Sequence, residues 1–215
     1  MTKYILITSE HIQVGKTTIT YNLANWLTQT LAAKVAVLDL NAFKTFDDQY
    51  RHTHYQPKIG MTYLPRMPFT TADLVNTNHY TSIAKYYERD QLVSHLKHYP
   101  DFEKYDYVLI NYFPNYRFVS PENLIAAYHP YVLAVSTPTP EFVELQHVMI
   151  MYQSQPRLAL ANDVWHRPHN LTHPKLAKLL PNETVAPTIK HQRRQGGLQT
   201  QLDLPTAALT KFLQS

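Results

Sequence analysis

The chain has 215 residues, of which 44% are hydrophobic, and carries a formal net charge of +4 at pH 7. That length predicts one domain over residues 1–215, and without a long apolar run or a leader before the first strand we expect neither a membrane span nor a secretory signal. The absence of cysteine excludes disulfides and thiolate chemistry and favours a cytoplasmic protein.

The first half of the chain predicts strands that alternate with helices. Residues 4–8 form an apolar run typical of a strand buried on both faces of a parallel sheet. From Thr17 apolar side chains recur at helical spacing, so we expect a helix that ends near Ala32–Ala33. A second buried strand is predicted at 34–40. The remaining elements of this half are an irregular loop at 42–57, a short strand at 59–64 and a helix from Asp90 that stops at Pro100.

The second half continues the alternation. Apolar runs predict strands at 105–111, 131–136, 158–162 and 184–189. Helix-start signals, in which serine or threonine precedes proline, occur at Ser120–Pro121 and Thr139–Pro140. Two further helices are predicted at 173–180 and 205–214. The whole pattern predicts an α/β fold of three layers, in which a mostly parallel central sheet is flanked by helices.

The junction between the first strand and the first helix carries Gly15-Lys16-Thr17-Thr18. A strand that runs through Gly-Lys-Thr into a helix is how P-loop proteins hold a nucleotide. Backbone N–H groups face the phosphates, the lysine supplies charge, and the hydroxyl binds Mg²⁺. We expect Gln13 and Val14 of the same loop to bind the nucleotide as well. The full Walker A pattern has a glycine five residues before Gly15, where this chain has Glu10, so the sequence predicts a nucleotide-binding loop of altered composition.

Four segments in a fixed order extend this pattern over nearly the whole chain. They are Val14–Thr18 with Asn22–Ala24, Val37–Asn41, Tyr105–Asn111 with Pro114, and Ser136–Glu141. The ordered set resembles the ParA/MinD group of P-loop ATPases, which includes plasmid- and chromosome-partition ATPases. The resemblance implies the P-loop NTPase fold, ATP or ADP with Mg²⁺ as ligands, and a site at the carboxyl ends of the strands. It also implies that Asn162, which falls where many members have an asparagine, contacts adenine.

The resemblance further assigns roles at the strand ends. Lys16 supports catalysis at the phosphates, and Thr17 binds Mg²⁺. Asp39 acts on the metal through water, and Asn41 stands at the position of a catalytic aspartate that orients the attacking water. Asn111 stands where the family has the Walker B aspartate, which holds magnesium.

Three charged positions of the family are neutral or only weakly basic in this chain. The lysine and two glycines of the family's phosphate loop are replaced by His11, Ile12 and Gln13, and the two aspartates by Asn41 and Asn111. Phosphoryl transfer is catalysed by positioning and charge stabilisation, so these changes affect hydrolysis more than binding. An asparagine can hydrogen-bond, but it cannot accept a proton or offset the charge of Mg²⁺.

The residues therefore predict an ATP-binding protein of DNA partition or protein positioning, with weak or no ATP hydrolysis. One alternative is an adaptor that keeps the fold and has lost nucleotide binding. Another is an ATP-dependent enzyme similar to dethiobiotin synthetase, whose loop also has a non-glycine residue before Val-Gly-Lys-Thr. Against the second alternative, Asp39-Leu40-Asn41 does not supply the substrate-contacting lysine that such an enzyme needs.

The C-terminal part is a candidate surface for DNA or an acidic partner. Residues 157–215 carry eight lysine or arginine side chains and three carboxylates. Lys190, Arg193 and Arg194 are candidate contacts to DNA phosphates, and an exposed solvated face explains them equally well. The resemblance adds a homodimer and a partner protein as expected assemblies.

The chain also contains twelve histidines, which raise the question of a metal site. The closest group is His166, His169 and His173, whose spacing matches no standard zinc pattern. Because Pro168 lies between them, we expect a loop at this point rather than a metal centre.

Overall fold

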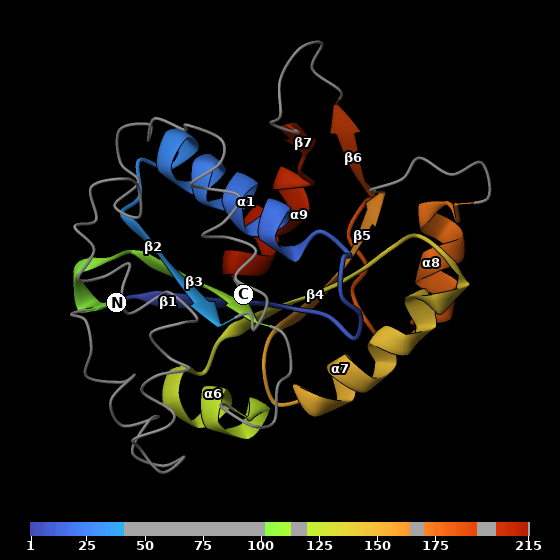
Figure 1. The fold of residues 1–215 in the computed structure, drawn as a ribbon, viewed down its shortest axis with the longest axis horizontal. Coiled ribbons are helices and arrows are strands. Elements are labelled where there is room, and N and C mark those ends of the chain that lie inside the picture. Colours follow the sequence, from blue (N-terminus) through green and yellow to red (C-terminus); the bar gives the residue numbers. More distant parts are fainter. Residues whose placement is uncertain (41–101, 113–119, 164–169, 193–200, 215) are drawn as a thin grey trace.

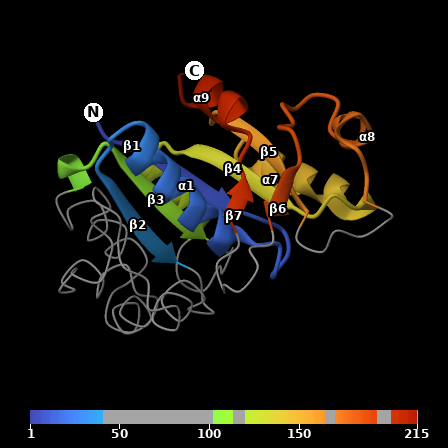
Figure 2. The ribbon, with the colours of Figure 1, turned by 90° about the horizontal axis from the view of Figure 1, so that it is seen from above.

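The computed structural model describes residues 1–40, 102–112, 120–163, 170–192 and 201–214 (Figure 1). Its strands are β1 (Lys3–Thr8), β2 (Val35–Leu40), β3 (Tyr107–Tyr112), β4 (Tyr131–Ser136), β5 (Arg157–Asp163), β6 (Ile189–Gln192) and β7 (Gln201–Asp203). They form one sheet in the order β2-β3-β1-β4-β5-β6-β7. Every neighbouring pair is parallel except β6 and β7, which are antiparallel. Figure 2 shows β2 at one side of the sheet, with β3 next to it.

Helices cover both faces of the sheet. They are α1 (Lys16–Thr30), η1 (Phe102–Lys104), α6 (Pro121–Tyr128), η2 (Pro140–Glu144), α7 (Leu145–Met151), α8 (His173–Leu179) and α9 (Thr206–Gln214), where η marks a 3₁₀ helix. In Figure 1, α1 and α9 lie on one side of the sheet, and α6 and α7 lie on the other. This arrangement confirms the predicted three-layer α/β fold. None of the helices in the described ranges is long and apolar enough to cross a membrane.

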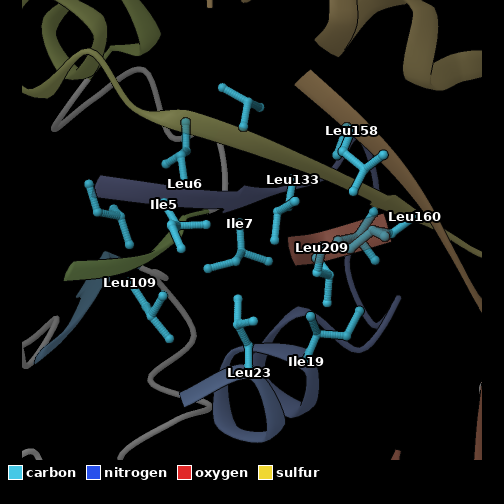
Figure 3. Packing of buried hydrophobic residues seen from close by; sticks show 14 of the residues in the cluster. Ile5, Leu6, Ile7, Ile19, Leu23, Leu109, Leu133, Leu158, Leu160 and Leu209 are labelled. Atoms are coloured by element: carbon cyan, nitrogen blue, oxygen red, sulfur yellow. The ribbon is translucent and has the colours of Figure 1, made fainter. Parts of the chain in front are cut away.

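The first helix is fixed to the sheet by a dry contact with β1. Ile7 of β1 points toward Ile19 and Leu23 of α1 (Figure 3), and all three side chains are at most 1% exposed. Leu209 of α9 packs on the same side of the sheet and is also buried. Burial of apolar area stabilises the folded state by about 25 cal/mol per Å². The contact between these side chains therefore holds the N-terminus of α1 beside the carboxyl end of β1.

The start of α6 follows its predicted signal. Ser120 is in the extended conformation, and its hydroxyl accepts a hydrogen bond from the Asn123 backbone N–H at 3.3 Å, with Pro121 as the first helical residue. The segment after Thr139 differs from the prediction of one helix, because it divides into η2 and the short α7, which ends at Met151.

The predicted strand at 184–189 is wrong in its bounds. Val185 makes only an isolated bridge to Ala159, and the regular strand β6 begins at Ile189. Pro187 explains the difference, since proline has no N–H to donate to a sheet ladder.

The sequence pattern also missed β7, whose Leu202 backbone N–H donates to Asn22 Oδ1 of α1 at 3.2 Å. The loop, strand and helix predicted at 42–57, 59–64 and 90–100 lie outside the described residues.

Candidate functional site

The site lies where the strand order reverses direction. From β1 the chain crosses to β2 on one side of the sheet, whereas β4 lies on the other side of β1. In parallel sheets, ligands bind at such a switch point, outside the carboxyl ends of the strands. The loop at residues 9–15, which connects β1 to α1, occupies this position.

The backbone at the end of this loop is shaped for a helix N-terminus. Gly15 is the N-cap of α1 and has φ 84° and ψ 22°, the left-handed region that glycine adopts without steric cost. The Gly15 carbonyl accepts the first helical hydrogen bond from Ile19 N–H at 2.9 Å. The first turn of α1 contains no acidic residue, and the positive end of the helix faces the loop, which favours an anion at this point.

Gln13 adopts a conformation that normally belongs to glycine. Its φ is 61°, in the left-handed region, whereas Ile12 is not among the described residues with positive φ. Of the two glycines that the ParA/MinD pattern has before Val14, only the second is therefore required by the backbone. A side chain with Cβ in this region costs about 1–2 kcal/mol.

We predict that Gln13→Gly raises the free energy of unfolding by about 1 kcal/mol, because it removes this steric cost and leaves only the entropic penalty of glycine in the unfolded chain. Urea unfolding of the purified chain measures the change. Gln13→Ala is the matched control, since it shortens the side chain and keeps Cβ, and it should gain nothing. A gain in the alanine variant equal to that in the glycine variant would contradict the interpretation.

Lys16 is folded back over the loop. Its side chain is 5% exposed, and its ammonium donates to Ser9 Oγ at 2.6 Å and to the His11 carbonyl at 3.3 Å. Ser9 Oγ in turn donates to the same carbonyl at 2.5 Å. These acceptors are neutral oxygens, and an anionic phosphate oxygen accepts a stronger, charge-assisted hydrogen bond from an ammonium. The arrangement therefore places a buried positive charge where a phosphate would meet the loop.

Thr17 and Asn111 meet beside Lys16. Both are buried, and Asn111 Nδ2 donates to Thr17 Oγ1 at 3.4 Å. The Thr17 hydroxyl is an oxygen donor of the kind that Mg²⁺ binds, so this residue fits the predicted metal ligand. Asn111 brings an uncharged amide next to it, and Asp39 is its register partner on β2, at the same level of the sheet. Asn41 lies outside the described residues.

Asn162 contacts the loop from the opposite direction. It is 0% exposed near the end of β5, and its Nδ2 donates to the Val14 carbonyl oxygen at 2.8 Å. The structure thus brings Val14, Lys16, Thr17, Asn111 and Asn162 to one edge of the sheet.

Comparison of this structure with solved structures finds similar folds in partition and cell-division proteins, two of them with a bound nucleotide. A putative plasmid partition protein from Borrelia burgdorferi bound to AMPPNP has a TM-score of 0.61 at 18% identity, over 91% of this chain and 86% of that chain. MinD, the septum site-determining protein of Pyrococcus horikoshii, complexed with Mg-ADP, has a TM-score of 0.50 at 15% identity, over 87% and 82%. The MinC:MinD cell division complex of Aquifex aeolicus has 0.52 at 17% identity, over 86% and 81%.

The chain has the ParA/MinD P-loop fold. The likeness is found by comparing structures and not by comparing sequences. No protein-family model matches the chain, and no curated protein matches it either. What this chain shares with the ParA/MinD structures is therefore the fold.

The loop residues Glu10 and His11, which depart from the family pattern, contact η2 and α7 through their side chains. The ring of His11, which stands at the position of the family's lysine, pairs with the Glu144 carboxylate. Glu10 Oε1 lies 3.6 Å from His147 Nδ1. Glu10 is thereby directed to α7. The side chains of His11 and Glu144 are 48% and 39% exposed, so such pairs contribute little stability, about 1 kcal/mol or less.

Sequence reasoning missed these two pairs. Glu144 and His147 lie more than a hundred residues from the loop, and neither belongs to a motif. The only signal in the sequence is their spacing of three, which puts both on one face of a helical segment.

The remaining candidate residues lie elsewhere. His173 hydrogen-bonds through Nε2 to the Val185 carbonyl at 2.9 Å, while His166 and His169 are outside the described residues. In the part of the chain that the structure describes, no group of three or more His, Asp or Glu side chains could hold a metal ion. Lys190 is exposed on β6, and Arg193 and Arg194 lie outside the described ranges.

Proposed function

We propose that this chain binds ATP or ADP together with Mg²⁺ at the loop 13–18 and acts in DNA partition or protein positioning. The observation that carries the proposal is the geometry of the loop between β1 and α1. Gly15 caps α1 in the left-handed conformation. Lys16 is buried at the same loop, and its ammonium donates a hydrogen bond to Ser9 Oγ at 2.6 Å. A ParA/MinD structure of the same fold binds AMPPNP, and another binds Mg-ADP.

In this proposal the residues of the loop have different roles in binding. The amides of Gly15, Lys16, Thr17 and Thr18 face the phosphates, and Lys16 supplies positive charge. Mg²⁺, when bound, offsets the charge of the phosphates. In this proposal Thr17 holds it, with Asp39 and Asn111 at the adjacent strand ends.

Hydrolysis should be weak or absent in this site. Asn111 is buried beside Thr17 and carries no charge, and Asn41 replaces the carboxylate that would orient the attacking water. Without those carboxylates the site retains the contacts that bind phosphate and loses those that stabilise the transferring group.

A phosphate-release assay with excess ATP and Mg²⁺ tests this part of the proposal. We expect at most about one turnover per hour, the scale of an unassisted GTPase site. The Lys16→Ala variant, purified in parallel, gives the background from contaminating ATPases. A rate above about one per minute in the wild type that disappears in Lys16→Ala would contradict weak hydrolysis and leave nucleotide binding intact.

The biological setting is the broader part of the proposal. The MinC:MinD complex among the structures of similar fold supports a partner protein for this chain. Lys190 is exposed and, with Arg193 and Arg194, would contact DNA phosphates without sequence preference. We further propose a single domain that works in the cytoplasm and forms a homodimer.

The rival function is an adaptor that binds no nucleotide. It predicts that ADP does not shift the unfolding temperature of the chain.

A further inference from the structure

Asn162 holds a peptide group of the phosphate loop. Its side chain is 0% exposed, and its Nδ2 donates to the Val14 carbonyl oxygen at 2.8 Å, across 148 residues of sequence. Val14 is itself 4% exposed, so its carbonyl group is held away from solvent. A buried carbonyl that loses its hydrogen-bond donor is costly, which makes this bond a strong constraint on the peptide.

The constraint extends to the next residue through the geometry of the peptide bond. The carbonyl of Val14 and the N–H of Gly15 belong to one planar unit, and in a trans peptide the two groups point in opposite directions. Anchoring the oxygen on Asn162 therefore directs the Gly15 N–H away from β5. Gly15 has φ 84°, and glycine is sterically able to adopt many backbone conformations, so its own sterics do not fix this peptide.

We infer that Asn162 is a positioning residue of the phosphate loop, which fixes the Val14–Gly15 peptide so that the Gly15 amide is directed at a phosphate chain regardless of the base. The inference rests on the proposed nucleotide binding and gives Asn162 a role different from the adenine contact that the sequence resemblance implies. A base contact would affect only ligands that carry adenine. A loop anchor affects every ligand that carries a diphosphate.

The test is calorimetric titration of the full chain with ADP, GDP and inorganic pyrophosphate. Asn162→Ala removes the donor. Asn162→Leu replaces the amide with an uncharged group of similar shape that has no donor, and it serves as the second variant if alanine destabilises the core. We expect all three ligands to bind about tenfold more weakly to each variant, by a common factor. Asn170→Ala is the matched control, since it removes an amide that donates to Asp163, the last residue of the same strand, and it should leave the three affinities unchanged.

The outcomes separate the competing roles. A purely structural role would lower the unfolding temperature and leave the affinities of the folded protein unchanged, which would overturn the inference. Weaker ADP binding with unchanged pyrophosphate binding would overturn it in favour of a base contact. If the wild type binds none of the three ligands, the proposed function fails and the inference fails with it, whereas binding that is unaffected in both variants overturns the inference alone.

Discussion

Replacing Lys16 with alanine should weaken the binding of ADP with Mg²⁺ about a hundredfold, or about 3 kcal/mol. Lys16 is 5% exposed, and its ammonium donates to Ser9 Oγ and to the His11 carbonyl, which are both neutral oxygens. A phosphate that takes their place gains a charge-assisted hydrogen bond in a desolvated setting, and truncation of such a partner typically costs a few kcal/mol. Calorimetric titration measures the change in dissociation constant.

The control for this prediction is another lysine near the sheet. Lys34 is exposed and precedes β2, at the opposite end of the parallel strands from the loop, so Lys34→Ala changes the net charge equally without touching the site. It should leave the affinity within about twofold, because exposed charges at this distance are screened. Equal losses in the two variants would mean that the affinity reflects net charge rather than the Lys16 contact.

Leu23→Ala should lower the free energy of unfolding by about 3 kcal/mol. Leu23 is 1% exposed and packs against Ile7 of β1 (Figure 3), so truncation loses transfer free energy and leaves a cavity in a close-packed layer. The same contact seats α1 on the sheet. We therefore expect the variant to have a lower urea midpoint and, where it remains folded, weaker ADP binding.

The same helix supplies the matched control. Leu31, at the C-terminal end of α1, is 46% exposed, and Leu31→Ala should change stability by no more than about 0.5 kcal/mol. If the two leucine variants were destabilised equally, the contact between α1 and β1 would not be what fixes the helix.

The strand–loop–helix unit at the start of the chain could be predicted because its signals are local. The apolar run at 4–8 and the helical spacing after Thr17 each fit one element, and Gly15 marks their junction. β7 could not be predicted in this way. It has three residues, and it is defined by its antiparallel pairing with β6 and its contact with Asn22, neither of which leaves a periodic pattern.

The sequence could predict which strand ends lie together, but not the contacts that their side chains make. Sequence order places Asn111 and Asn162 at strand ends, and parallel strands bring those ends to one edge. What each side chain touches depends on the folded loop. The bond from Asn162 to Val14 and the pair between His11 and Glu144 join segments more than a hundred residues apart, which no spacing in the sequence encodes.

The most direct test of the central claim is a crystal structure of the chain with AMPPNP and Mg²⁺. We expect the β- and γ-phosphates on the backbone amides of 15–18, with the Lys16 ammonium moved from Ser9 Oγ and the His11 carbonyl to a phosphate oxygen. A structure grown at saturating nucleotide in which Lys16 still bonds Ser9 and His11, and no phosphate lies in the loop, would contradict nucleotide binding at this site.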